Sequence, residues 1–190
     1  MNFSSPWRWI KDYAAHDDPL VASANLIALV VVSNQPFYPL YLYWLVGPDI
    51  APSCWLFLST PFFAAVPAIT RLNKTAGRAL LPLAGIANTV LSAKVFGVAS
   101  GVEMFLIPCV LIGFVLFRPS ERLIGLVIAA LAFFTFTLLH GRYGAPVHVY
   151  TPEQYASFIK LNATSVGTLT AFVGLLVMGL IGETEGRKGS

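Results

Sequence analysis

The feature that most constrains this chain is a succession of long apolar segments separated by short polar ones. An α-helix rises 1.5 Å per residue, so about 20 apolar residues cross the ~30 Å hydrocarbon core of a bilayer. Only 11% of the 190 residues are charged, against about 25% in a soluble domain, so most of the surface faces lipid. We therefore predict an all-α membrane protein, a bundle of six transmembrane helices. The predicted spans are Leu20–Leu45, Trp55–Ile69, Arg78–Phe96, Gly101–Phe117, Arg122–Leu139 and Tyr155–Ile181.

The distribution of lysine and arginine predicts the orientation of this bundle. Nine of the twelve positive residues fall on one side of the predicted membrane, namely Arg8, Lys11, Arg71, Lys74, Arg78, Arg118, Arg122, Arg187 and Lys188. The other three are Lys94, Arg142 and Lys160. The positive-inside rule places the richer side, and with it both termini, in the cytoplasm of a bacterial inner membrane. Because the positive residues form neither a block nor a basic face, the sequence does not predict nucleic-acid binding.

Three parts can be distinguished along the chain. Residues 1–18 are predicted to form a short cytoplasmic helix on the membrane surface, because Ser5 and Pro6 are typical of a helix start and Trp7, Ile10 and Ala14 share one face. Residues 19–181 form the six-helix transmembrane domain. Residues 182–190 are polar, and we expect a disordered cytoplasmic tail that leads to an effector outside this sequence.

The loop between the fifth and sixth predicted spans is the richest in groups that could bind a ligand. It contains His140, Arg142, Tyr143 and His148, and Lys160 follows on the sixth span. Tyrosines at such a place also serve as anchors at the membrane interface. The loop is therefore either a ligand site on the outer side or a structured cap without a ligand.

The same loop ends in a signal for the start of a helix. Thr151 is followed by Pro152 and Glu153. Proline is favoured at the first helical position, and a threonine before it can accept a hydrogen bond from a free backbone N–H of the first turn. We therefore expect Thr151 to cap the sixth span.

Two further ionisable residues lie on the same predicted side. Lys94 ends the third span and Glu103 begins the fourth, with the short turn 97–101 between them. One interpretation is an ion pair within a helical hairpin, in which the lysine extends to the interface. The other is that both residues line a pocket that opens outward.

The first predicted span contains an unusual polar segment. Asn34 and Gln35 precede Pro36, and five aromatic residues follow, namely Phe37, Tyr38, Tyr41, Tyr43 and Trp44. Because proline removes a backbone hydrogen bond, we expect a kink or a break. Polar side chains beside an aromatic wall could hold a small amphipathic ligand, and we add Asn34, Gln35 and Tyr38 to the candidate site.

Small residues repeat every four positions on two of the predicted spans. They are Ala163, Gly167 and Ala171 on the sixth span, and Gly125 and Ala129 on the fifth. Such faces let two helix backbones approach closely. They predict either packing within the bundle or, on the sixth span, the seam of a homodimer.

No catalytic motif occurs, and we predict that the chain itself is not an enzyme. The two cysteines, Cys54 and Cys109, do not have the spacing of a metal site. Membrane haem usually needs two axial histidines from spans, but only His140 lies at a span end. We therefore predict no metal and no cofactor, with haem as the alternative.

Two segments carry a resemblance to a known family. The sequence SNQPFYP at positions 33–39 and the sequence LHGRYG at positions 139–144 are similar to the N-terminal six-span region of some bacterial class III adenylate cyclases. The resemblance covers most of the chain. It implies a dimeric, receptor-like membrane domain that regulates a cytoplasmic cyclase domain producing cAMP. No such catalytic domain follows Ser190 in this sequence.

The sequence as a whole favours a sensor or regulatory domain embedded in the lipid bilayer. It would receive a small lipophilic or periplasmic ligand at its outer side or within the membrane, and control a cytoplasmic effector. The alternatives are a small-molecule transporter, which should show a polar path and inverted repeats, a haem- or quinone-binding anchor, and a purely structural anchor.

Overall fold

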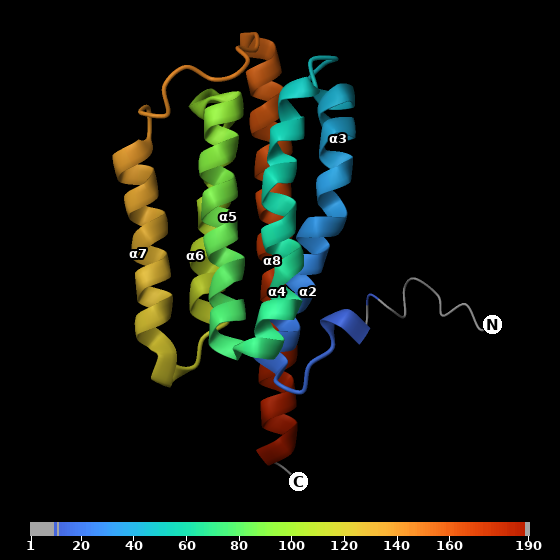
Figure 1. Cartoon of the computed structure of the whole chain (residues 1–190), viewed down its shortest axis with the longest axis vertical. Helices are drawn as coiled ribbons and strands as arrows, with labels where there is room; N and C mark the ends of the chain where they lie inside the picture. Colours follow the sequence, from blue (N-terminus) through green and yellow to red (C-terminus); the bar gives the residue numbers. More distant parts are fainter. Residues whose placement is uncertain (1–9, 11, 189–190) are drawn as a thin grey trace, which may run out of the picture.

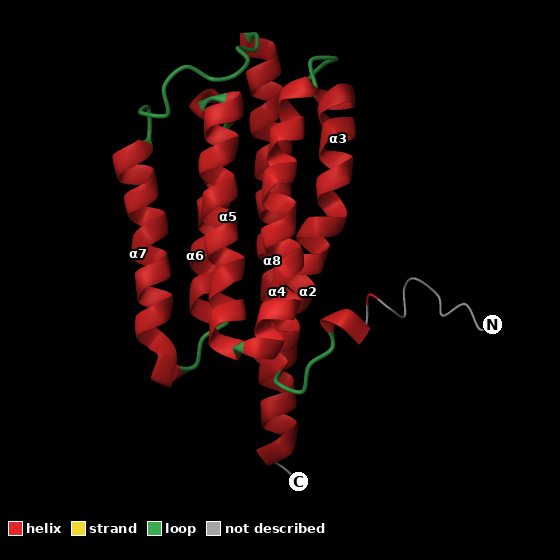
Figure 2. Ribbon diagram, viewed as in Figure 1, coloured by secondary structure: helices red, strands yellow, loops and turns green. Residues whose placement is uncertain are grey.

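A computed structural model describes residue 10 and residues 12–188, and most of these residues are helical (Figures 1 and 2). The elements are α2 (Pro19–Asn34), η1 (Gln35–Phe37), α3 (Tyr38–Leu45), η2 (Ala51–Ser59), α4 (Thr60–Leu72), α5 (Lys74–Phe96), η3 (Val98–Ser100), η4 (Val102–Phe105), α6 (Leu106–Val115), η5 (Pro119–Glu121), α7 (Arg122–Leu139) and α8 (Pro152–Lys188). The elements marked η are 3-10 helices. No strand occurs among the described residues, which confirms the predicted all-α class.

The long helices stand side by side in one bundle, with connections at its two ends (Figure 1). We call the end with the 140–151 loop the upper end, and the end with the α4–α5 turn the lower end. Helix α5 lies near the middle and contacts α2, α4, α6 and α7. Helix α8 continues beyond the other helices at the lower end (Figure 1).

Five helical stretches are long and apolar enough to cross a membrane: Pro19–Leu45, Ala51–Leu72, Lys74–Phe96, Pro119–Leu139 and Pro152–Leu180. They confirm the expectation of several membrane-span-like helices. The fourth predicted span, Gly101–Phe117, corresponds to a shorter apolar helix over Val102–Val115. This helix consists of η4 followed by α6, which ends at Val115.

Local sequence signals explain where several helices begin. Asp18 caps α2 by accepting a hydrogen bond from the Leu20 N–H, and Pro19 follows at the first helical position. Asn73 caps α5 through the Ala76 N–H. At the start of α8, the hydroxyl of Thr151 accepts a hydrogen bond of 3.3 Å from the N–H of Gln154, the third residue of the helix, as expected of a cap.

The expected break in the first span is a single tight turn. Pro36 cannot donate a backbone hydrogen bond, and the helix narrows to the 3-10 form over Gln35–Phe37 before it continues as α3. The stretch Pro19–Leu45 remains one membrane-span-like helix. The kink therefore changes the helix geometry without ending the span.

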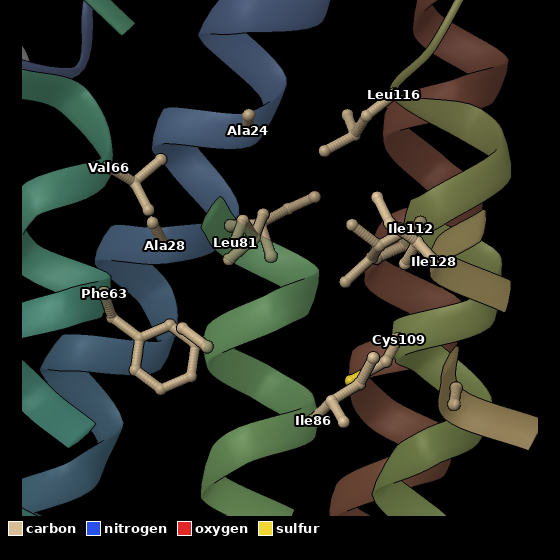
Figure 3. Close-up of a cluster of buried hydrophobic side chains, with 14 of the residues drawn as sticks. Ala24, Ala28, Phe63, Val66, Leu81, Ile86, Cys109, Ile112, Leu116 and Ile128 are labelled. Atoms are coloured by element: carbon tan, nitrogen blue, oxygen red, sulfur yellow. The ribbon is translucent and has the colours of Figure 1, made fainter. Parts of the chain in front are cut away.

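The core consists of two groups of buried side chains. The lower group joins α2, α4, α5, α6, α7 and α8, and Figure 3 shows Ala28, Val66, Leu81, Ile112 and Ile128 among its members. The upper group is aromatic and includes the rings of Phe96, Tyr150 and Phe158. The Phe96 ring centroid lies 5.1 Å from that of Phe158. This upper group holds the top of α8 against α5.

The two small-residue faces differ in their surroundings. A Cβ atom added to Gly125 would lie 2.4 Å from the Gly113 carbonyl oxygen, so α6 and α7 touch through their backbones. Gly125 thus supports the packing interpretation on the fifth predicted span. On α8, by contrast, Ala163, Gly167 and Ala171 are exposed. An added Cβ at Gly167 would have no neighbour within 4 Å, so this face does not pack inside the bundle.

The two ends of the chain are described only in part. Most of the predicted interfacial helix lies outside the described residues, although residues 12–14 are helical. The Tyr13 hydroxyl donates a hydrogen bond of 3.0 Å to the Ala64 carbonyl oxygen, which attaches this segment to α4. At the other end we expected a disordered tail from Gly182, but α8 continues to Lys188. The tail contains no proline and several residues that favour helix.

Candidate functional site

A buried carboxylate at the upper end forms the centre of a polar network. Glu103, on η4, is 8% exposed. Its Oε2 atom lies 2.6 Å from Nδ1 of His140, and its Oε1 atom accepts a hydrogen bond of 2.9 Å from the Tyr143 hydroxyl. We call these three residues the Glu103 network. Its members come from η4, from the end of α7 and from the following loop.

Glycines shape the turn that positions Glu103. Gly97 (φ 81°) and Gly101 (φ 73°) adopt backbone conformations that side chains disfavour. Between them the chain leaves α5, makes the single turn η3 and enters η4. This compact reversal places the carboxylate beside His140, the residue that follows α7.

Within the network, the carboxylate is buried and the imidazole is exposed. The Glu103 side chain is 7% exposed and the His140 side chain is 54% exposed. Burial and the nearby Glu103 carboxylate raise the pKa of the Tyr143 hydroxyl above its usual range. Tyr143 therefore remains a hydrogen-bond donor at neutral pH. His140 is therefore the exposed member of the Glu103 network, and Glu103 is its buried member.

Lys94 does not form the ion pair with Glu103 that was one interpretation of the sequence. Its ammonium group donates a hydrogen bond of 2.7 Å to the Ala145 carbonyl oxygen. In the part of the chain that the structure describes, no ion pair joins Lys94 to Glu103. The Val147 N–H also donates to the carbonyl oxygens of Lys94 and Val95, at 3.2 Å each. Lys94 thus secures the loop next to the Glu103 network.

His148 belongs to a second anchor of the same loop. Its Nε2 atom lies 3.8 Å from a carboxylate oxygen of Asp49, and its ring packs edge-on against Tyr150 with 4.5 Å between centroids. The Tyr150 hydroxyl donates a hydrogen bond of 3.0 Å to the Asp49 carbonyl oxygen. Burial and the Asp49 carboxylate raise the pKa of Tyr150 to about 12. The loop is thereby fastened to the turn between α3 and η2.

The three candidates on the first span have three different partners. The Tyr38 hydroxyl donates a hydrogen bond of 3.2 Å to Asn162 on α8. Gln35 donates one of 2.7 Å to the Ser59 hydroxyl. Asn34 is exposed and accepts one of 3.4 Å from Tyr41. The predicted site on this span is thus divided between two interhelical contacts and one exposed amide.

Arg142 and Lys160 are exposed, and neither side chain joins the Glu103 network within the described residues. By contrast, Asn162 is fully buried and was not among the predicted site residues. It donates a hydrogen bond of 2.9 Å to the Ser100 carbonyl oxygen while it accepts the one from Tyr38. The signal for Asn162 was a polar amide at membrane depth, which commonly bonds across helices.

Sequence reasoning also missed a polar clamp at the lower end. The guanidinium of Arg78 is 2% exposed and forms two bonds with the Glu121 carboxylate, at 2.7 and 3.0 Å. It also donates to the Leu116 carbonyl oxygen at 2.7 Å. Arg118 pairs with Asp18 at 2.8 Å. These pairs tie α2 and α5 to the α6–α7 turn.

No group of three or more His, Cys, Asp or Glu side chains that could hold a metal ion occurs in the described part of the chain. No protein-family model, curated protein or solved structure matches this chain. Its function is therefore inferred from the Glu103 network and from the contacts that link this network to α8.

Proposed function

We propose that this chain is a multi-pass membrane domain that receives a signal at the Glu103 network and transmits it through α8 to a cytoplasmic effector. The observation that carries this proposal is the continuity of α8. One uninterrupted helix of 37 residues begins beside the upper loop and continues beyond the rest of the bundle at the lower end (Figure 1). A displacement of its top can therefore reach its lower end.

The proposed topology has six spans, with the upper end outside and both termini in the cytoplasm. Arg71, Lys74, Arg78, Arg118 and Arg122 all belong to elements that meet at the lower end. The positive-inside rule then places this end in the cytoplasm of a bacterial inner membrane. The helix Val102–Val115, together with Leu116 and Phe117, would be the fourth span.

The contacts of α8 support a role in transmission. Near its top, Asn162 joins α8 to Tyr38 on α3 and to Ser100 on η3, two residues before the start of the η4 segment that carries Glu103. Of the five candidate spans, α8 is the least buried. Lower down, Val173 of α8 is buried in the lower core group, but most of the surface of α8 is left uncovered by the bundle. Such a helix can move with less loss of contact than the other spans. A ligand that bound two positions of α8 with different affinity would shift their populations.

The partners follow from this arrangement. The effector is proposed to be a nucleotide cyclase that produces cAMP, as the resemblance of the 33–39 and 139–144 segments implies. Ala163, Gly167 and Ala171 form an exposed small-residue face on α8, which would bring two copies together in a homodimer. The chain itself has a regulatory role and carries out no catalysis.

The test is a fusion in which the catalytic domain of a class III adenylate cyclase follows Lys188. The fusion is expressed in a bacterium without its own cyclase, and cAMP is measured at matched membrane levels. We expect Glu103→Gln to change the output severalfold, because the amide removes the negative charge that lies against both His140 and Tyr143. Glu153→Gln removes an exposed acid at the same end and should leave the output unchanged.

A second fusion carries an unrelated six-span anchor in place of residues 19–181. If this fusion and the Glu103→Gln variant both gave the output of the parent fusion, the signalling proposal would be rejected. Fluorescence-detected size exclusion of each variant shows whether it is folded in the membrane fraction.

A further inference from the structure

The two ring nitrogens of His140 have different surroundings. Nδ1 lies 2.6 Å from Oε2 of the buried Glu103 carboxylate, while the His140 side chain as a whole is 54% exposed. In the part of the chain that the structure describes, no protein group bonds the other nitrogen, Nε2. The imidazole is therefore held at one edge and open at the other.

The partner of Nδ1 determines which ring nitrogen carries the proton. An ionised carboxylate has no proton to donate, and Glu103 already accepts a hydrogen bond of 2.9 Å from the Tyr143 hydroxyl. Nδ1 therefore donates to Oε2. In a neutral imidazole only one nitrogen is protonated, so Nε2 keeps its lone pair. A carboxylate bonded to one imidazole nitrogen also makes the opposite nitrogen a stronger acceptor.

This acceptor lies where a membrane-span-like helix ends. The stretch Pro119–Leu139 stops at the residue before His140, and α7 stands at one edge of the bundle (Figure 1). One turn earlier on α7, the Phe136 ring is 45% exposed, and its centroid lies 5.1 Å from that of the His140 ring. A lipophilic molecule at the membrane interface can thus reach both a lone pair and an aromatic ring.

We propose that Nε2 of His140 accepts a hydrogen bond from the hydroxyl group of a lipophilic phenol, whose ring packs on Phe136. One donor thereby serves one acceptor. A phenol is more acidic than an aliphatic alcohol and donates a stronger hydrogen bond, and an aromatic ring with a polar tip suits the membrane interface. The inference rests on the proposed function, because it names the ligand class of the Glu103 network.

The first experiment determines which nitrogen of His140 is protonated. Protein with ¹⁵N-labelled histidine is examined by NMR in nanodiscs at about pH 8.5, where a histidine is ordinarily neutral. The chain has three histidines, and the signals missing from His140→Gln belong to His140. We expect a protonated Nδ1 and an unprotonated Nε2 in the wild type, and a loss of this preference in Glu103→Gln. A protonated Nε2 in the wild type would leave no lone pair for the ligand and would overturn the proposal.

The second experiment measures the binding of a defined probe. Nanodiscs that contain the wild-type protein are titrated with para-octylphenol, and para-octylanisole, in which a methyl group replaces the hydroxyl proton, is the matched control. The phenol should move the His140 Nε2 signal saturably toward that of a protonated nitrogen. The anisole should leave the signal in place, because it has no proton to donate. Equal shifts with both compounds would show partitioning into lipid only and would contradict the proposed hydrogen bond.

Two exposed phenylalanines on α7 provide matched variants. Phe136 contacts the His140 ring, whereas Phe134, which is 53% exposed, packs against Phe133. Phe136→Leu should weaken the binding of para-octylphenol about three- to tenfold, and Phe134→Leu should leave it unchanged. Glu103→Gln should weaken it about tenfold, because Nε2 is no longer held as an acceptor. Size exclusion first establishes that each variant is folded. Unchanged affinity in either Phe136→Leu or Glu103→Gln would rule out the proposed site.

Failure of this inference differs from failure of the signalling proposal, because binding is measured without an effector. If para-octylphenol binds as expected but leaves the cAMP output of the cyclase fusion unchanged, the phenol site stands without the signalling role. If Glu103→Gln changes the output but the phenol does not bind, the signalling role stands and the phenol site is rejected.

Discussion

Tyr150, at the upper end, combines a buried ring with a hydrogen-bonded hydroxyl group. Its ring packs against Phe158 with 4.8 Å between centroids, and its hydroxyl donates to the Asp49 carbonyl oxygen. Both the low exposure of the ring and the nearby Asp49 carboxylate disfavour the phenolate form. Tyr143 is in a similar position beside Glu103. These two phenols fasten the 140–151 loop as long as they stay protonated.

The pKa of Tyr150 predicts a loss of stability at alkaline pH. In the unfolded chain the phenol ionises near its usual pKa of 10.0, whereas in the folded protein the pKa is raised to about 12. Above pH 10 the unfolded state therefore binds fewer protons than the folded state, and stability falls as pH rises. Below pH 10 this residue contributes no pH dependence.

The measurement is Tm of the protein in nanodiscs between pH 8 and pH 11.5. Tyr150→Phe should reduce the slope above pH 10, and the double variant with Tyr143→Phe should reduce it further. Tyr43→Phe, at an exposed position on α3, serves as the control. Equal alkaline slopes in the wild-type and double-variant proteins would show that these two phenols do not ionise differently on unfolding.

Small residues have opposite consequences on two helices. On α7, Gly125 is needed because the backbone of α6 lies against it. On α8, Gly167 faces the exterior with open space around it. The same residue type therefore sets the distance between two helices in one case and leaves a helix surface uncovered in the other.

This difference predicts opposite effects of alanine. In Gly125→Ala the new Cβ would lie 2.4 Å from the Gly113 carbonyl oxygen, and the helices must separate, at a cost of about 1–3 kcal/mol. Within a single copy, Gly167→Ala meets no neighbour and should stabilise the monomeric helix by about 0.5–1 kcal/mol. Thermal unfolding of the two variants measures the difference. Similar Tm values for both would contradict the close contact of α6 and α7.

Different kinds of interaction stabilise the two ends of the molecule. The lower end is held by the charged pairs Arg78–Glu121 and Arg118–Asp18. The upper end is held by aromatic packing and by the Glu103 network. Arginine pairs suit a cytoplasmic boundary rich in positive residues, and the proposed orientation agrees with this asymmetry.

Cysteine labelling checks that orientation. Val149 in the upper loop is 72% exposed and Leu72 at the lower end is 85% exposed. In a background with Cys54→Ser and Cys109→Ala, a membrane-impermeant maleimide should label Val149→Cys in intact spheroplasts. Leu72→Cys should react only after the membrane is permeabilised. The reverse pattern would place the upper end in the cytoplasm, and labelling of both in intact cells would exclude a membrane between them.

The sequence alone was sufficient to predict the helical class, the membrane-span-like character of most segments and the Thr151 cap. These features depend on apolar length, on proline positions and on capping residues, which are properties of neighbouring residues along the chain. The expected kink at Pro36 was also visible for this reason, because the missing N–H is a property of proline itself.

The tertiary structure alone decided which polar groups meet. Lys94 and Glu103 are close in sequence, yet Lys94 bonds to Ala145 and Glu103 to His140 and Tyr143. Arg78 resembled a charge flanking a span, but it is buried against Glu121. Such partnerships depend on the relative rotation and height of packed helices, which are set by contacts between residues far apart in the chain.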